Sequence, residues 1–182
     1  METSKYKGRI VEVVEFDVEQ GGKKMVFEKA RRSPGVRLII FHEGKVLLSK
    51  EERHEIGGYD YRLPGGKVFD TLEEYSSALS TGVDIAEAAK AAAIKEALEE
   101  VGINVTDASF FHKSVCGTTI EWDLFYFVVT AFTHAGETAL EDGEDIESAF
   151  YDIDTAKRMC LDGSMNDERS ALILLRYLDS LS

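Results

Sequence analysis

Apolar and β-branched residues near the start of the chain are arranged as in two neighbouring β-strands. Residues 8–17 and 24–30 are rich in valine, isoleucine and phenylalanine, and Gly21 and Gly22 lie between them. Because paired glycines readily adopt the positive φ angles of a tight turn, this pattern predicts an antiparallel hairpin. The chain is therefore expected to begin with an N-terminal β-hairpin.

Helical patterns occur in the middle and at the end of the chain. Residues 84–101 are dense in alanine, leucine, lysine and glutamate, which favour helix, and Gly102 is a natural C-terminal stop. Residues 154–161 and 168–181 also have helical spacing, with aspartates near plausible N-caps. Further strands are expected at 36–44, 45–52, 59–66, 109–117, 120–132 and 146–154.

The order of these elements predicts an α+β fold. The strand at 120–132 is nearly continuous in apolar residues, as expected when both faces of a sheet are covered. Helices on both faces would give an α/β/α sandwich. We expect a hairpin region at 1–33 and one domain at 34–182, in which 71–83 is hard to place and is treated as an insertion.

The charge balance argues against some classes of partner. The chain has 34 acidic and 21 basic residues and a formal net charge of -13. Such a surface repels a phosphate backbone, so nucleic acid is not expected as a partner. The acidic excess is typical of a well-solvated surface, and it would also suit divalent cations that prefer oxygen ligands. Composition alone does not choose between these two interpretations.

Other motifs are informative mainly by what they exclude. Cys116 and Cys160 lie far apart without CxxC spacing, so neither a zinc site nor a disulfide framework is indicated. No segment approaches the roughly 18 apolar residues of a membrane span, so a cytoplasmic protein with no membrane partner is expected. The histidines lack ligand spacing and no serine lies in a GxSxG pattern, which argues against acyl-transfer chemistry.

Three glutamates on the predicted helix are candidates for chemistry. Glu96, Glu99 and Glu100 are separated by three and four residues, so they project within an arc of roughly 100°. An ordinary solvated helix face, with Lys95 compensating the charge, would have the same pattern. The opposite face is expected to pack on the sheet through Ile94, Leu98 and Val101.

The surrounding sequence resembles a long and specific family motif. Residues 63–68 are LPGGKV and residues 95–103 are KEALEEVGI, with Glu87 eight positions before Lys95. Together they resemble the Nudix box, in which Gly, five residues, Glu and seven residues precede Arg-Glu-aliphatic-any-Glu-Glu-any-Gly-aliphatic. The resemblance implies the Nudix fold, with a mixed central sheet flanked by helices.

Two departures from the family pattern affect the expected site. Lys95 replaces the arginine of the box; it cannot form a bidentate fork, but its charge can orient Glu99 at i+4. Twenty residues, instead of five, separate Gly66 from Glu87. The longer spacing suggests an insertion that reshapes the substrate entrance rather than the metal site.

The resemblance implies a magnesium-dependent reaction, with manganese as a possible substitute. Pyrophosphate oxygens repel a nucleophile, and divalent cations held by oxygen ligands counter this repulsion. By resemblance, Glu96 and Glu100 are the principal metal ligands and the Gly66 carbonyl is a backbone ligand. Glu99 is a further ligand or holds the attacking water, so Glu99 and Glu100 are also catalytic candidates.

Glu87 and the acidic run at 141–145 each have two interpretations. Glu87 could support the metal shell, but Asp84 and Glu87 also have the spacing of a helix capping box. A late loop in this family often supplies a carboxylate that positions or deprotonates water, and Glu141 and Glu144 are the candidates here. The same acidic run could equally be a solvated turn.

The layout resembles the ADP-ribose pyrophosphatase branch of the family, in which N-terminal strands help to form a dimer. A homodimer that uses residues 1–33 is therefore expected. Arg53 matches a phosphate-binding arginine of the family, and Arg62 and Arg37 are further substrate-binding candidates. Base-stacking candidates, each of which could instead belong to the core, are Tyr59, Tyr61 and Phe27.

The implied activity is hydrolysis of a pyrophosphate bond in a nucleoside diphosphate linked to another group, with ADP-ribose converted to AMP and ribose 5-phosphate. A nucleotide-sugar or dinucleotide pyrophosphatase is the alternative within enzymes, because fold and motif leave the substrate open. A non-catalytic Nudix nucleotide sensor is the alternative from another class. The retained glutamates argue against it, since a sensor gains little from clustered carboxylates. An enzyme for oxidised nucleoside triphosphates is disfavoured by the extra hairpin.

Overall fold

The computed structural model describes residues 2–53, 57–136, 138 and 146–181, and it leaves the Arg53 side chain undescribed. No helix within these residues has both the length and the apolar character needed to cross a membrane. In chain order the elements are β1 (Glu2–Lys7), β2 (Glu12–Gln20), β3 (Lys23–Arg31), β4 (Gly35–His42), β5 (Lys45–Arg53), β6 (Gly58–Arg62), α1 (Leu72–Thr81), α2 (Ile85–Val101), β7 (Ile103–Ser114), β8 (Ile120–Glu121), β9 (Leu124–His134), β10 (Ile146–Asp152), α3 (Ile153–Leu161) and α4 (Glu168–Asp179).

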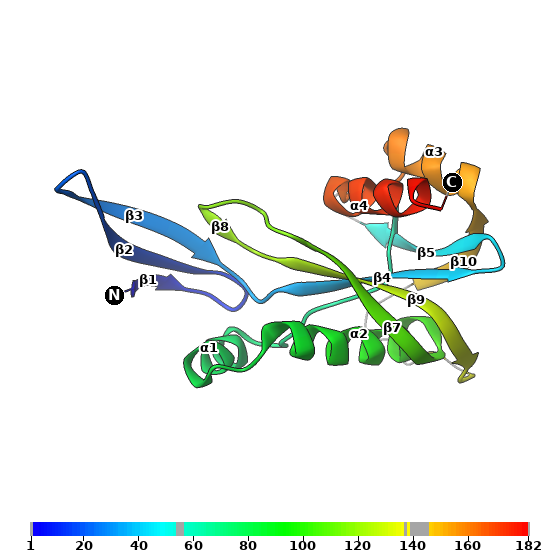
Figure 1. Cartoon of the computed structure of the whole chain (residues 1–182), viewed down its shortest axis with the longest axis horizontal. Coiled ribbons are helices and arrows are strands. Elements are labelled where there is room, and N and C mark those ends of the chain that lie inside the picture. The colour runs from blue at the N-terminus through cyan, green and yellow to red at the C-terminus, as the bar shows by residue number, and fades with distance from the viewer. Residues whose placement is uncertain (1, 54–56, 137, 139–145, 182) are drawn as a thin grey trace.

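A mixed central sheet carries the core, as the sequence predicts. Its strand order is β10-β5-β4-β9-β7, with β6 paired to β5. Strands β4 and β9 run parallel, whereas the other pairs in this sheet are antiparallel. Helix α2 covers one face, and α3 and α4 cover the other (Figure 1). The α+β sandwich is therefore confirmed.

Strict alternation along the central strands explains how both faces are buried. On β4, Val36 and Leu38 pack in the cluster under α2, whereas Ile39 packs in the cluster under α3 and α4. On β9, Phe127 faces α2 and Tyr126 faces the other layer. Because successive side chains of a strand point to opposite faces, a continuously apolar strand can serve two helical layers.

The N-terminal strands form a second sheet that extends away from the central one (Figure 1). Strands β2 and β3 pair around Gly21 and Gly22, which have φ angles of 61° and 74°, so the hairpin is confirmed. The sheet is larger than predicted, with the order β1-β2-β3-β8. Strand β1 escaped prediction because its polar sequence is exposed at every position. Strand β8 contributes only a two-residue parallel pairing.

Residues 71–83 contain helix α1, which joins the two parts of the molecule. Thr71 caps the helix, and its hydroxyl accepts a hydrogen bond from Glu74 N at 3.2 Å. The Tyr75 hydroxyl donates to Glu121 at 3.2 Å, and Lys7 of β1 pairs with Glu73 at 3.0 Å. Burial and the Glu121 carboxylate raise the Tyr75 pKa, so this phenol remains a hydrogen-bond donor.

Helix α2 packs on the sheet through alanines, which corrects the predicted packing face. Ala89, Ala93 and Ala97 are fully buried, whereas Ile94 and Leu98 are 40% and 42% exposed. The predicted limits of the helix are right: Asp84 caps it and Gly102, with φ of 69°, ends it. Alanines recur every four residues along one helix face, and their small size lets the helix lie close to the strands.

This close packing generates a test of stability. Replacing Ala93 with Leu should lower the free energy of unfolding by about 1–3 kcal/mol, because added methylenes force apart a well-packed layer. Ala91→Leu on the exposed side of α2 is the matched control and should be nearly neutral. Urea unfolding monitored by circular dichroism would measure both, and equal stabilities would contradict the assignment of the packing face.

Candidate active site

The LPGG segment takes the place of a strand beside β4. Strands β4 and β5 pair only next to their connecting turn, at Phe41 and His42. Beyond that point Leu38 N donates to Pro64 O at 2.9 Å, and Val36 N donates to Gly66 O at 3.0 Å. The backbone hydrogen bonds that β5 leaves unmade are thus satisfied by the loop. This pairing fixes Gly65 and Gly66 beside β4, within the central sheet.

Steric constraints favour glycine at both Gly65 and Gly66 of this loop. Gly65 has φ of 141°, and a Cβ there would collide with the backbone of Val36. At Gly66 a Cβ would overlap the carboxylate of Glu96 on α2. Only glycine therefore lets the loop and the helix meet this closely.

Helix α2 directs two of its three motif glutamates at the loop. Glu100 accepts a hydrogen bond from Gly65 N at 2.8 Å, and Glu96 lies against Gly66. Glu99 forms an ion pair with Lys95 at 3.3 Å, which confirms that the lysine orients Glu99 at i+4. Within the described residues, no three Asp, Glu, His or Cys side chains converge closely enough to hold a metal ion. Glu96 and Glu100 meet at the loop, while Glu99 is turned toward its lysine.

Glu87 lies away from this meeting point. It precedes Glu96 by nine residues, which places the two side chains on opposite sides of the helix. Glu87 is exposed and lines a separate groove with Lys90 and Phe110. Asp84 Oδ1 accepts from Ala86 N at 2.9 Å and from Glu87 N at 3.3 Å, which is the Asp84 half of the predicted capping box. The role of the Glu87 carboxylate stays a prediction.

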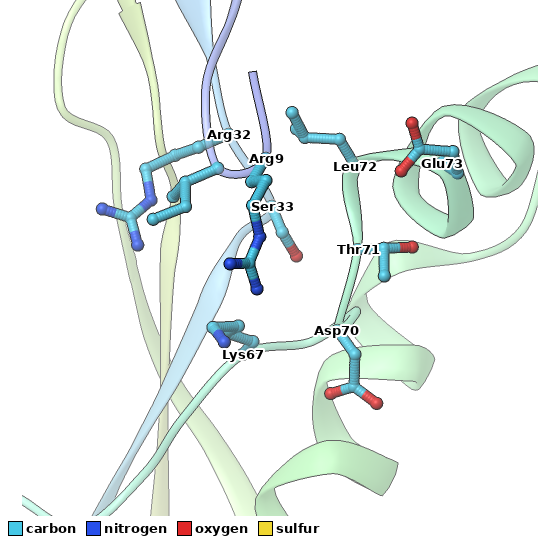
Figure 2. Close-up of a pocket in the computed structure, with 9 residues that line it drawn as sticks. Arg9, Arg32, Ser33, Lys67, Asp70, Thr71, Leu72 and Glu73 are labelled. Atoms are coloured by element: carbon cyan, nitrogen blue, oxygen red, sulfur yellow. The ribbon is translucent and has the colours of Figure 1, made fainter. Parts of the chain in front are cut away.

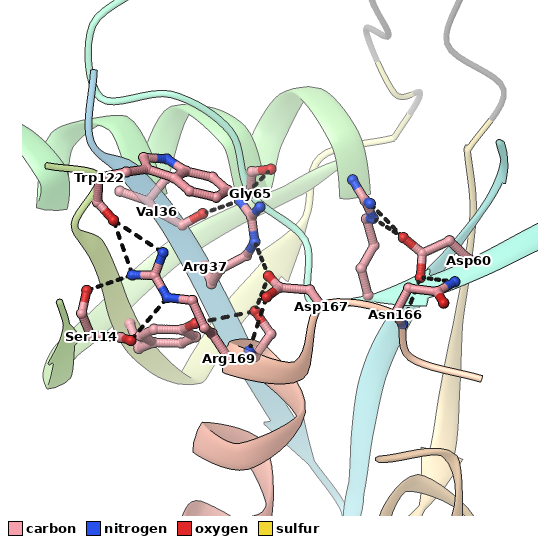
Figure 3. A network of polar contacts seen from close by, with 12 residues as sticks. Val36, Arg37, Asp60, Gly65, Ser114, Trp122, Asn166, Asp167 and Arg169 are labelled. Atoms are coloured by element: carbon pink, nitrogen blue, oxygen red, sulfur yellow. Dashed lines mark hydrogen bonds and ion pairs between the residues drawn. The ribbon is translucent and has the colours of Figure 1, made fainter. Parts of the chain in front are cut away.

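Arg37 is buried beneath the loop and holds it from the other side. Its Nη1 donates to Val36 O at 2.8 Å and to Gly65 O at 3.3 Å (Figure 3). Its Nε lies 3.8 Å from the carboxylate of Asp167, the N-cap of α4, and has no hydrogen-bond acceptor among the described residues. Burial lowers the Arg37 pKa, and Asp167 partly opposes this effect. The positive charge of Arg37 therefore depends on the Asp167 carboxylate for compensation.

Arg62 belongs to a second charged cluster near the loop. Its guanidinium donates to the buried Asp60, with Nε at 3.0 Å, and its Nη1 lies 3.5 Å from Glu51. Asp60 also accepts from the backbone N of Asn166 at 3.1 Å, so β6 is tied to the loop before α4. These carboxylates fix the orientation of Arg62, whose side chain remains 25% exposed.

The remaining predicted site residues are Arg53, the two glutamates of the late loop and the three aromatic candidates. Strand β5 ends at Arg53, but its side chain lies outside the described residues, as do Glu141 and Glu144. Tyr61 packs against the core and meets Tyr151 edge-on. The remaining aromatic candidates are exposed: Tyr59 lies under Lys50, and Phe27 stacks on Phe16.

Two acidic residues of this region were not predicted as site residues. Asp60 escaped because Asn166, which it binds across 106 positions of sequence, comes from a distant segment. Its position between two tyrosines on an alternating strand is the available signal, because the strand period points it inward. Asp167 was recognised only as a helix cap, and its pairing with Arg37 depends on the packing of α4 against β4.

The geometry matches a known family. A family model described as the NUDIX domain matches residues 31–170, which includes both segments of the motif. The chain belongs to the Nudix family. It is accordingly a Nudix pyrophosphohydrolase, and hydrolases of this family generally use divalent metal ions.

Comparison with solved structures agrees on the fold. The chain is similar to a protein described as "Crystal structure of ADP compounds hydrolase", with a TM-score of 0.70 and 19% sequence identity. The match covers 100% of this chain and 94% of that chain. At this identity the likeness shows the Nudix fold alone. A comparison with curated proteins found no match.

The residues at the loop fit a divalent cation. Carboxylates of Glu96 and Glu100 and a peptide carbonyl are hard oxygen donors, which such cations prefer. The Gly66 carbonyl already accepts from Val36 N, but a carbonyl oxygen has two lone pairs. The missing Cβ at Gly66 also leaves the space that the Glu96 carboxylate occupies.

This space can be tested at Gly66. Alanine at this position should weaken Mn²⁺ binding by roughly 10–100-fold, because its methyl group displaces the Glu96 carboxylate. Gly66 does not have a left-handed φ, so backbone strain does not complicate the effect. Gly58→Ala, where a Cβ meets nothing within 4 Å, is the matched control. Titration calorimetry would measure both, and unchanged affinity in Gly66→Ala would refute the proposed geometry.

The Arg37–Asp167 pair can be tested by comparing two helix caps. Asp167 and Asp152 each accept bonds from a backbone N–H and a hydroxyl three residues later. Because asparagine caps helices about as well as aspartate, Asp152→Asn should change stability little. Asp167→Asn should cost about 1–3 kcal/mol more, because it leaves the buried Arg37 charge uncompensated. Chemical denaturation would measure the difference, and equal losses would mean that Arg37 does not depend on Asp167.

Proposed function

We propose that this protein hydrolyses ADP-ribose to AMP and ribose 5-phosphate in a magnesium-dependent reaction. The observation that carries the proposal is the meeting of Glu96 and Glu100 with the Gly65–Gly66 loop, with Arg37 and Arg62 close by. A carboxylate pair on a glycine loop, with Arg62 near it, suits a substrate whose two phosphates are anionic and must be both bound and activated.

Each residue has a defined role in this proposal. Glu96, Glu100 and the Gly66 carbonyl would hold the cation, and Glu99 would be either a further ligand or the residue that holds the attacking water. When bound, a divalent cation supplies positive charge that screens the phosphate oxygens and acidifies an attacking water. Arg37 keeps the loop in place through the Gly65 carbonyl, so it is a positioning residue rather than a direct phosphate ligand.

The reaction requires one water and one proton acceptor. The water oxygen forms a bond to one phosphorus, the bridging P–O bond breaks, and each product retains one phosphate. Glu99, fixed by Lys95, is the described carboxylate best suited to orient the water and accept its proton. Glu141 and Glu144 are the further candidates for this role. Arg62, and Arg53 by resemblance, would pair with the diphosphate.

Related nucleoside diphosphate compounds form a second substrate class. The structural neighbour is described as a hydrolase of ADP compounds rather than of ADP-ribose alone. Nucleotide sugars and dinucleotides therefore belong in any substrate panel. We also propose that the protein works in the cytoplasm as a homodimer that uses the N-terminal strands, whose apolar Val26 and Phe27 are 60% and 43% exposed.

Activity can be tested with a matched pair of glutamate variants on α2. Glu100→Gln should reduce Mg²⁺-dependent release of AMP from ADP-ribose on the order of 10²-fold or more, because a charged oxygen at the reacting centre is lost. Glu87→Gln removes the same charge from the far side of the helix and should retain activity. A panel of ADP-ribose, nucleotide sugars, dinucleotides and nucleoside triphosphates, with products separated by ion-exchange chromatography, would identify the substrate. Binding without turnover across the panel would instead favour a sensor.

A further inference from the structure

A cleft of about 450 Å³ lies between the N-terminal sheet and helix α1 (Figure 2). Its walls come from the β1–β2 connection, the end of β3, the segment after Gly66 and the start of α1. Its volume is within the range of small-molecule sites, roughly 300–1,000 Å³. The lining residues are Arg9, Ile10, Arg32, Ser33, Lys67, Asp70, Thr71, Leu72 and Glu73.

Arg32 is the least solvated of the basic residues in this cleft. Its guanidinium lies over the Trp122 ring, 4.2 Å from the centroid, and within the described chain it forms no ion pair with a carboxylate. Burial, together with the charge of Arg37, lowers the Arg32 pKa. A partly desolvated cation without an acidic partner gains from a nearby anion.

Arg9 and Lys67 add two exposed cations. In Figure 2 the Arg9 guanidinium reaches toward Lys67, whereas the carboxylates of Asp70 and Glu73 lie on the other side. Glu73 is already paired with Lys7 at 3.0 Å. The cleft is therefore locally basic on a chain whose formal net charge is -13. A basic cluster on an acidic surface concentrates anions at one place.

The segment that lines the cleft is held by hydrogen bonds and adjoins the proposed active site in the chain. Ser33 Oγ donates to Phe69 O at 2.9 Å and accepts from Phe69 N at 3.1 Å. Val68 N donates to Pro34 O at 2.9 Å, so the segment after the box loop is fixed to the start of β4. Lys67 directly follows Gly66, which contacts Glu96. One substrate can therefore extend from the carboxylates into the cleft.

We propose that this basic cleft binds a phosphomonoester that the substrate carries outside its scissile pyrophosphate. The proposal rests on the proposed function, because it assigns a further group to the same substrate. In the proposed function, the two phosphates of the scissile bond are bound at the loop and by Arg62 and Arg53. The cations of the cleft are therefore available to bind a different anionic group. A phosphomonoester has close to two negative charges and three acceptor oxygens, which suit the Arg9 guanidinium and the Lys67 ammonium, with the positive charge of Arg32 at the cleft wall.

Binding of matched compounds without divalent metal tests the cleft independently of hydrolysis. The probes are 2′-phospho-ADP-ribose against ADP-ribose, and coenzyme A against 3′-dephospho-coenzyme A. Titration calorimetry in EDTA should give at least about tenfold tighter binding for the phosphorylated member of one pair. The double variant Arg9→Gln/Lys67→Gln should reduce that preference to below about threefold. Lys67→Arg should preserve the preference, because it keeps the charge.

The control double variant, Lys24→Gln/Arg176→Gln, removes the same charge from exposed positions outside the cleft. It should keep the wild-type preference, which would exclude an effect of net charge. Equal binding within both pairs, or a preference that survives in Arg9→Gln/Lys67→Gln, would overturn the proposal. Cleavage of ADP-ribose, together with equal binding of the phosphorylated and unphosphorylated probes, would leave the proposed function intact. Tighter binding of the phosphorylated probes without any metal-dependent cleavage would support the cleft proposal and refute the proposed function.

Discussion

Helix α2 can lie close to the central sheet because alanines face the strands, and the site depends on this close approach. Ala89, Ala93 and Ala97 are fully buried, so the helix axis is not held away by long side chains. The next residues around the helix, Glu96 and Glu100, are then brought to the Gly65–Gly66 loop. Larger apolar residues on the buried face would separate the carboxylates from the peptide groups that they meet.

Charges on the opposite face of the sheet hold the same loop. Arg37 points from β4 toward α4, where Asp167 caps the helix and lies 3.8 Å from its guanidinium. A positive side chain next to a helix N-terminus is unfavourable by itself, because that end of the helix dipole is positive. Asp167 offsets both charges. The loop is thus fixed by glutamates from one helical layer and by an arginine that depends on the other.

The residues between Gly66 and Glu87 surround the site while Gly66 still contacts Glu96. Helix α1 contacts the N-terminal sheet through Tyr75 and Glu73, and the segment before it is fixed to the start of β4 through Ser33. It therefore forms a wall beside the loop instead of displacing it. A family reaction can be kept while a basic cleft is added next to it, because the two features share only the backbone after Gly66.

The sequence by itself determined most of the elements and most of the motif. Glutamate spacing, the alanine-rich helix with its caps and the paired glycines are local patterns, and the structure agrees with them. The predicted strand at 120–132 instead divides into β8 of the N-terminal sheet and the double-faced β9 of the central sheet. Local patterns also led to errors. Ile94 and Leu98 were predicted to face the sheet because of their hydrophobicity, but small alanines form most of the packing face; Val101, the third residue of that prediction, does pack on the core. The predicted strand at 59–66 ends at Arg62.

Only the tertiary structure decided which of these residues meet. The contact of Gly66 with Glu96, the pairing of Arg37 with Asp167, and the binding of Asn166 to Asp60 join segments that are far apart in sequence. The cleft beside α1 likewise gathers cations from three separate segments. Sequence spacing predicts neighbours along one helix or strand, where the backbone repeat fixes the geometry. Contacts between elements depend on how layers pack, and no local repeat encodes that.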